Sequence, residues 1–260
     1  MGAQSHIALL DGAFKANRVL SALSDDAVAQ LAPHVMKRSF EKGTPLWSEA
    51  QPSSAITFPL SGLISITWVD LLGGGVEVGF AGNDSAVGFS TDDVTRGTVQ
   101  VPGTFLQVRA ERFWSLAADV AELRLMAECC REAMLTQARA LAACNALHDV
   151  QARLCRWLLQ VSDRAGVEIT STQEEIAQLL GVRRTTLTLI AHRLQQDQVI
   201  RYRRGLIVVR DRARLRELAC GCYREMAEQR PPAERMVPTV TRLWSPPKPD
   251  RDVRPPLGSR

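Results

Sequence analysis

Thr172-Gln-Glu-Glu-Ile-Ala-Gln-Leu-Leu-Gly-Val-Arg-Arg-Thr-Thr-Leu-Thr-Leu-Ile-Ala-His-Arg-Leu194 predicts two short helices joined by a tight turn. Thr172 is a helix-capping residue, and Glu175 follows three residues later, which is the capping-box pattern. Gly181 can adopt the left-handed conformation that ends one helix and turns the chain sharply. The stretch therefore predicts a helix-turn-helix.

The second helix of this stretch has two contrasting faces. Apolar residues recur at helical spacing on one side, namely Leu187, Ile190, Ala191 and Leu194. The opposite side carries polar and basic residues, namely Arg184, Thr185, Thr188 and His192. A helix with a polar, basic outer face has the shape that enters the major groove of DNA.

The charge of the chain is concentrated around this stretch. Between residues 172 and 216 there are ten Arg and no Lys against four acidic residues, a net charge of 10 − 4 = +6, whereas the whole chain carries +4. A module that faces nucleic acid has this bias. A solvated basic surface has it too, so charge does not decide between the two.

The region from about 38 to 110 predicts a small antiparallel barrel or roll. Hydrophobic residues alternate with other residues in short runs, for example Ile56, Phe58 and Leu60, and glycines punctuate the runs. Before it, residues 17–36 have a helical pattern with a start signal at Ser24. The expected fold class is therefore α+β, with a β-roll in the N-terminal half.

No Gly or Pro occurs between Gly103 and Gly166, which predicts a long helix. Its apolar seam consists of positions 116, 120, 123, 127, 130, 134, 141 and 144. The spacing alternates between three and four residues, as in helices that pair with a second copy. We expect a homodimer through this helix; the alternative is that the seam packs on the chain's own roll.

Several signals complete the C-terminal half. Asp149 predicts the cap of a helix that starts at Val150, with a hinge at His148-Asp149. Residues 199–209 predict two short strands that turn near Arg204-Gly205, and a last helix is expected over 211–229. The rest of the chain is rich in Pro and Arg, which predicts a disordered tail.

The expected organisation therefore has five parts. They are an N-terminal leader (1–17), a β-roll (18–113), a dimerisation helix (114–148), a winged helix-turn-helix (149–229) and a disordered tail (230–260).

This order of parts resembles the Crp/Fnr family of bacterial transcription regulators. In the roll, the similar stretches are Phe40-Glu-Lys-Gly-Thr-Pro-Leu and Ile56-Thr-Phe-Pro-Leu-Ser-Gly-Leu-Ile-Ser. In the C-terminal third they are residues 172–194, Val199-Ile-Arg-Tyr-Arg-Arg-Gly, and Ala219-Cys-Gly-Cys-Tyr223, which resembles the ending of one branch. The resemblance covers roughly residues 18–226 and implies a roll that resembles cyclic-nucleotide-binding domains.

The resemblance implies a set of DNA-binding residues. Arg184 stands where the family's arginine reads guanine, and a guanidinium fork matches the O6 and N7 acceptors of that base. Thr186 stands at a phosphate-contacting position, Thr185 replaces a common Glu, and Leu189 replaces a second Arg, so the target sequence should differ from the family's usual one. The expected DNA-binding residues are Thr172, Gln173, Arg183, Arg184, Thr185, Thr186, Thr188, Leu189, His192, Arg193, Arg203 and Arg204.

The expected sensor lacks the signature of cyclic-nucleotide binding. Where family members carry Gly-Glu for the ribose, this chain reads Gly88-Phe89, and no Arg-Ser or Arg-Thr pair follows for the phosphate. A buried phosphate without a cationic fork is poorly compensated. The effector is therefore unknown and is not expected to be a cyclic nucleotide. No cofactor is expected either, since the N-terminal cysteines of the iron–sulfur branch are missing before Cys129.

The six cysteines include no C-x-x-C pair. Cys129-Cys130 and Cys220-x-Cys222 could be redox sensors or metal ligands, but small buried helix residues are the favoured interpretation, so no metal site is expected. No nucleophile, base and oxyanion set is apparent, so no catalytic residue is expected and the protein is not expected to be an enzyme.

The predicted function is that of a homodimeric, sequence-specific regulator of transcription whose partner is double-stranded DNA. RNA polymerase is a further candidate partner. The sequence contains no run of about 18 apolar residues, so no membrane span is predicted. Free thiols indicate the cytoplasm. The alternative is a ligand-sensing or scaffold protein whose C-terminal module binds a protein partner.

Overall fold

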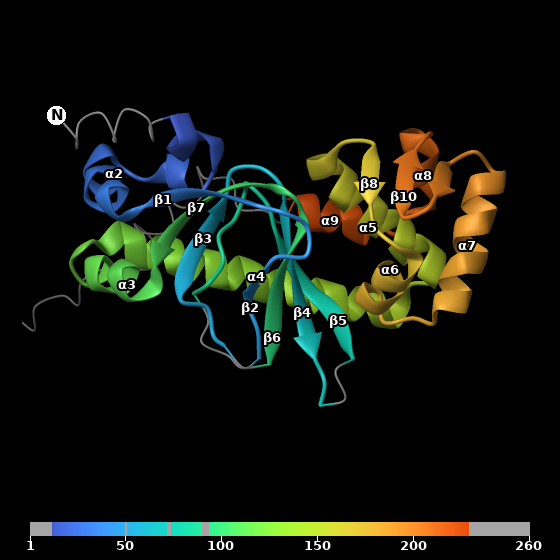
Figure 1. The fold of residues 1–260 in the computed structure, drawn as a ribbon, viewed down its shortest axis with the longest axis horizontal. Coiled ribbons are helices and arrows are strands. Elements are labelled where there is room, and N and C mark those ends of the chain that lie inside the picture. The colour runs from blue at the N-terminus through green and yellow to red at the C-terminus, as the bar shows by residue number, and fades with distance from the viewer. Residues whose placement is uncertain (1–11, 50, 72–73, 90–93, 229–260) are drawn as a thin grey trace, which may run out of the picture.

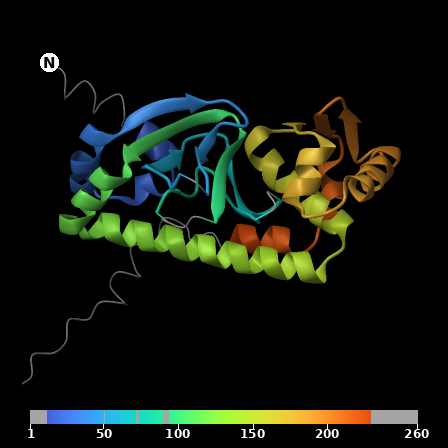
Figure 2. The same cartoon turned by 60° about the horizontal axis from the view of Figure 1, so that its bottom comes forward.

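A computed structural model describes residues 12–49, 51–71, 74–89 and 94–228. The molecule is elongated, with a β-rich body at one end and the C-terminal module at the other (Figure 1). One long helix, α4, runs beneath both parts (Figure 2). All of the expected tail (230–260) and the first eleven residues of the leader lie outside the described residues.

The N-terminal helical region is broken into short pieces. A 3-10 turn (Leu20–Ala22) precedes α2 (Asp25–Leu31), and a second 3-10 turn (Ala32–His34) follows it. Ser24 caps α2 as predicted, because its hydroxyl accepts a hydrogen bond from the backbone N–H of Ala27 at 3.3 Å. The helical pattern predicted over 17–36 is confirmed as these short pieces, except at its end, where Met36 begins β1; Pro33, which lacks an N–H donor, lies in the second 3-10 turn.

The predicted roll is confirmed as two antiparallel sheets. The seven strands are β1 (Met36–Phe40), β2 (Pro45–Trp47), β3 (Ala55–Pro59), β4 (Leu63–Val69), β5 (Gly75–Ala81), β6 (Thr95–Val101) and β7 (Gly103–Arg109). One sheet has the order β1-β7-β3 and the other β2-β6-β4-β5. The inward side chains of the two sheets form the core of the roll, among them Phe58, Ile64 and Phe105.

The predicted single long helix is two helices. α3 (Ala110–Asp119) ends at Val120, whose backbone is extended (φ −102°, ψ 99°), and α4 (Ala121–Leu147) begins directly after it. The break lets α3 pack on β3 and β7 while α4 continues beneath the roll (Figure 2). Periodicity did not reveal the break because the apolar spacing continues through Val120.

The apolar seam of α4 packs on the chain's own roll and C-terminal module. Leu123, Ala127 and Cys130 belong to the core beneath the first sheet, and Leu141 and Cys144 belong to the core of the C-terminal module. For this seam, the alternative of packing within one chain is correct. The outer side of α4 still exposes apolar residues, with Leu135 at 45% and Leu147 at 77%.

The C-terminal module combines helices with a small sheet. Its elements are α5 (Val150–Ala165), β8 (Glu168–Thr170), α6 (Gln173–Leu179), α7 (Arg184–Gln196), β9 (Ile200–Arg203), β10 (Leu206–Val209), α8 (Arg212–Leu218) and α9 (Cys222–Glu228). Asp149 caps α5 as predicted, accepting a hydrogen bond from Ala152 at 2.9 Å. The expected last helix is broken at Ala219, which is extended, so that α9 turns back against α4 (Figure 2).

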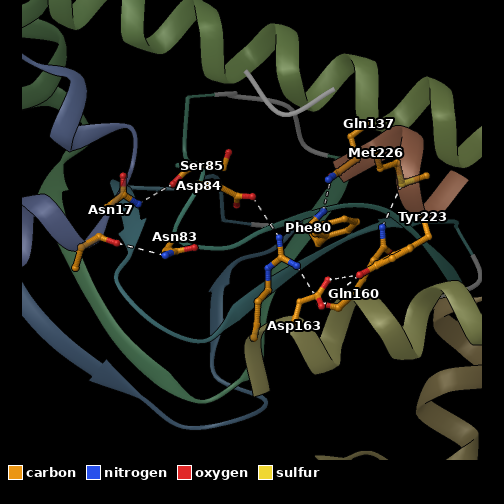
Figure 3. A network of polar contacts seen from close by, with 12 residues as sticks. Asn17, Phe80, Asn83, Asp84, Ser85, Gln137, Gln160, Asp163, Tyr223 and Met226 are labelled. Carbon is orange, nitrogen blue, oxygen red and sulfur yellow. Dashed lines mark hydrogen bonds and ion pairs between the residues drawn. The ribbon is translucent and has the colours of Figure 1, made fainter. Parts of the chain in front are cut away.

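The module is anchored to the roll by polar contacts that link distant segments (Figure 3). Arg164 of α5 pairs with Asp84 at 3.4 Å, and its guanidinium carbon lies 5.3 Å from the centre of the Phe80 ring. The backbone N–H of Phe80 donates to Gln137 of α4 at 2.7 Å. Phe80 also belongs to the module's hydrophobic core, so the two parts share one packed interior.

Among the described helices, none is long and apolar enough to span a bilayer.

Candidate DNA interface

The turn between α6 and α7 has the predicted geometry. The hydroxyl of Thr172 accepts from the backbone N–H of Glu175 at 3.1 Å, and the Glu175 carboxylate accepts from the Thr172 N–H at 3.2 Å, which completes the capping box. Gly181 has φ +63°, a left-handed conformation that favours glycine. The N–H of Val182 then donates back to Ala177 at 2.9 Å and fixes the corner.

The two faces of α7 are as predicted. Leu187 and Leu194 are each 1% exposed, and they pack in the core of the module with Ile176 of α6. The opposite face points away from the roll, and α7 forms the far edge of the molecule (Figure 1). The N-cap Arg183 makes no side-chain capping bond, so its side chain does not satisfy the first N–H groups of α7. Such a helix start suits a DNA phosphate.

The expected DNA-binding residues gather on this outer surface. Ten are exposed, namely Thr172, Arg183, Arg184, Thr185, Thr188, Leu189, His192, Arg193, Arg203 and Arg204, and two are half-buried, namely Gln173 and Thr186. Leu189 is 65% exposed, an unusual position for a large aliphatic side chain. Leu189 projects from a polar face and does not belong to the hydrophobic core.

Arg184 is weakly held. Its Nε lies 3.7 Å from the Glu174 carboxylate, and both side chains are about two-thirds exposed (67% and 68%). A surface pair of this kind contributes about 0–1 kcal/mol, so leaving it for another partner costs little. Beside it, the Thr188 hydroxyl donates to Gln173 at 2.7 Å, which ties α7 to the start of α6.

The predicted wing is a two-residue hairpin. β9 and β10 pair from Ile200–Val209 to Arg203–Leu206, and the two loop residues, Arg204 (φ 48°) and Gly205 (φ 80°), both have left-handed backbones. This is the pattern of a type I′ turn, in which Asn or Gly is the usual first residue. An arginine there is conformationally unfavourable, and strained residues of this kind cluster at functional sites. It places a guanidinium at the tip of the wing.

The opposite face of the helix-turn-helix contacts the roll. Lys42 pairs with Glu175 at 2.5 Å, and a Cβ added at Gly181 would lie 3.3 Å from Val76 of β5. Partial burial opposes ionisation of Glu175, but the hydrogen bonds from Lys42, Ser171 and the Thr172 backbone lower its pKa below 4.5. The docked face is therefore occupied, and α7 and the wing are left outward.

Between the roll and α4 lies a cavity of about 400 Å³. Its walls are mainly apolar, with Trp47, Val78 and Met134 among the lining residues, and Arg131 is the single charged residue among those described in its wall. Phe89, at the expected ribose position, is buried and packs edge-on against Phe113 at a centroid distance of 5.5 Å. Arg96 pairs instead with Glu49 at 2.7 Å. That the effector is not a cyclic nucleotide stays a prediction.

One cluster was missed by the sequence analysis. Side-chain ligand atoms of Cys144, His148, Cys220 and Cys222 all lie within 4.8 Å of one another. A hydrogen bond with Cys220 lowers the pKa of the Cys144 thiol to about 5, although burial opposes the shift. The signal was split between two segments 76 residues apart, because Cys144 and His148 lie one helical turn apart on α4 while Cys220 and Cys222 flank a glycine.

Comparison with known proteins identifies the C-terminal module. Residues 152–218 match the family described as the Crp-like helix-turn-helix domain. No curated protein matches the chain in sequence.

Solved structures with the same fold cover most of the chain. A protein described as a transcriptional regulator of the Crp/Fnr family from Eubacterium rectale is 16% identical with a TM-score of 0.64, covering 78% of this chain and 98% of its own. FixK2 from Bradyrhizobium japonicum is 14% identical with a TM-score of 0.60, covering 72% and 98%. The c-di-GMP-responsive regulator CLP from Xanthomonas campestris is 18% identical with a TM-score of 0.59, covering 72% and 100%. At these identities the likeness establishes the fold.

Proposed function

We propose that the chain is a regulator of the Crp/Fnr type that controls transcription by binding specific duplex DNA, since residues 152–218 match a Crp-like helix-turn-helix domain and the fold is similar to that of Crp/Fnr structures. The observation that carries the proposal is the outer surface of α7 and the wing. Arg183, Arg184, Arg193, Arg203 and Arg204 are all exposed on these elements, and α7 lies at the edge of the molecule far from the roll (Figure 1).

Within this surface the residues have different roles. Arg184 begins α7 and reads guanine, while Leu189 lies five residues further along the helix and contacts a thymine methyl. Arg203 and Arg204 of the wing and the first turn of α7 bind phosphates, which position the module without reading sequence. Thr186 and His192 are further phosphate contacts.

The active form is a homodimer through α4. Leu135 and Leu147 are exposed on α4, and Ala142 and Ala146 lie exposed between them. The dimer surface is therefore this exposed stripe of α4, and not the apolar seam that packs within the chain. Two modules then reach half-sites about one helical turn, roughly 34–36 Å, apart. RNA polymerase is a candidate partner of the bound dimer.

Selection of bound sequences from random duplex DNA tests the proposal. A dimer predicts an enriched palindrome with half-sites one helical turn apart, with at least one G in each half-site. No enrichment over the starting pool would contradict sequence-specific binding. An enriched single half-site with a monomeric protein in sedimentation would contradict the dimer.

A further inference from the structure

Four side chains with metal-binding atoms converge where α4 ends and where α8 turns into α9. Cys144 lies in the last turn of α4 and His148 is its C-cap, while Cys220 lies in the turn before α9 and Cys222 is the first residue of α9. The three cysteines are buried, at 0%, 8% and 6% exposure, and the histidine is half-buried. All six cysteines of the chain are free thiols.

The spacing of the ligand atoms suits one small tetrahedral ion. The Sγ atoms of Cys144 and Cys220 are 3.5 Å apart, and Cys222 Sγ is 3.5 Å from His148 Nδ1. With bonds of about 2.3 Å to sulfur and 2.0 Å to nitrogen, a tetrahedral zinc ion holds its ligands roughly 3.5–3.8 Å apart. Because every pair already lies within 4.8 Å, side-chain shifts below about 1 Å complete the geometry.

We propose that Cys144, His148, Cys220 and Cys222 bind one Zn²⁺ ion in a closed, structural Cys₃His site. Three thiolates and a neutral imidazole are ligands that zinc prefers, and four protein ligands leave no open position for catalysis. The histidine coordinates through Nδ1, so its proton is on Nε2.

The surroundings suit the charge of such a site. Zinc with three thiolates carries a net charge of −1. Arg153 and Arg156 of α5 are 7% and 1% exposed, and among the described residues neither lies within ion-pair distance of a carboxylate. The Nε atoms of both guanidinium groups have no hydrogen-bond partner among the described residues, although Arg153 donates to the Leu180 carbonyl and Arg156 to the Gln160 side chain. Buried guanidinium groups are stabilised by a nearby anion.

The position of the site gives it a structural role. It joins the end of α4 and the hinge at His148-Asp149 to the last part of the C-terminal module. The backbone N–H of Cys220 also contacts Ala152 of α5 at 3.4 Å, so three helices meet here. A bound ion fixes the direction in which the module leaves α4, and with it the orientation of α7.

Metal analysis of the full chain, purified without chelators, tests the proposal. The expected content is about one zinc per chain. Exchange for Co²⁺ should give the visible absorption of tetrahedral cobalt with thiolate charge-transfer bands. Cys144→Ser and Cys220→Ser should weaken zinc binding by at least about 100-fold, more than a change beside the ligands causes. Cys129→Ser, on the same helix but outside the cluster, is the matched control and should keep the zinc.

Titration of the wild-type chain with an organic mercurial needs no variant, and covers the case in which a ligand variant does not fold. Zinc should be released as three thiols are modified. The proposal is overturned if the folded chain neither contains nor binds zinc, if it holds iron and sulfide, or if Cys144 and Cys220 form a disulfide. Retention of zinc by folded Cys220→Ser would also overturn it. These results do not depend on DNA binding, so the two proposals fail separately.

Discussion

Two arginines of the C-terminal module, Arg164 and Arg184, are paired in opposite ways. Arg164 faces the roll, its side chain is 7% exposed, and it pairs with Asp84, whose side chain is 9% exposed. Arg184 faces outward with 67% exposure, and its nearest carboxylate is 3.7 Å away on an equally exposed side chain. On the inner face the arginine forms a buried ion pair that stabilises the fold, whereas on the outer face the arginine is available for a binding partner.

The largest expected effect is on the inner face. Arg164→Met should lower the free energy of unfolding by about 3 kcal/mol, because the buried carboxylate of Asp84 loses this cation. Urea denaturation measures the loss. Arg214→Met is the control, since Arg214 pairs with Glu217 at 2.7 Å on the surface and should cost under about 1 kcal/mol. Equal losses in the two variants would mean that the inner pair contributes no more than a surface pair.

On the outer face, Arg184→Ala should affect recognition and not stability. We expect a loss of about 1–3 kcal/mol in discrimination for guanine at one position of each half-site. The free energy of unfolding should change by less than about 0.5 kcal/mol. Arg203→Ala should instead weaken all duplexes alike and reduce the salt slope by about 1. Competition binding with selected and mutated duplexes distinguishes the two; unchanged specificity of Arg184→Ala would reject its role as base reader.

At the tip of the wing, a substitution of Arg204 should raise the free energy of unfolding and weaken DNA binding. Arg204→Gly should raise the free energy of unfolding by up to about 1 kcal/mol, because glycine adopts the left-handed conformation without strain. The same change should weaken DNA binding, since it removes a phosphate contact. Arg203→Gly, in a regular strand, is the control and should destabilise the module. A destabilised Arg204→Gly variant would show that the arginine has a structural role at the tip.

The smallest expected effect concerns the Lys42–Glu175 pair between roll and helix-turn-helix. The pKa of Glu175 is lowered on folding, so its contribution is present above pH 4.5 and is lost as the pH falls through the lowered value. Because the Glu175 side chain is 47% exposed, the contribution should not exceed about 1 kcal/mol. The stability difference between wild type and Glu175→Gln should shrink on acidification. A difference that grows would contradict this sign.

What the sequence predicted follows the same division. The helix-turn-helix depends on local patterns, and the predictions made from them are confirmed. These patterns are the pairing of Thr172 with Glu175, Gly181 at the turn, and the helical spacing of Leu187 and Leu194. The inner face depends on which distant segments meet. Periodicity continued through Val120, so the break before α4 was not predicted.

The cluster of Cys144, His148, Cys220 and Cys222 shows the same limit. Cys144 and Cys220 are 76 residues apart in sequence, and the break at Ala219 brings them within 3.5 Å. No local spacing indicated that Cys220-x-Cys222 would face α4. The burial of these cysteines was predicted, but the residues that lie beside them were not.

The most direct measurement of the central claim is a salt titration of binding to a duplex of random sequence. Several arginines that contact phosphates should release condensed counterions, so the logarithm of the affinity should fall steeply and linearly with the logarithm of salt concentration. If the four exposed arginines other than Arg184 contact phosphate, at roughly −0.9 per contact, the expected slope is about −3.6 or steeper. No measurable binding at low salt, or binding with a flat salt dependence, would contradict a DNA-binding surface on α7 and the wing and would favour a protein partner.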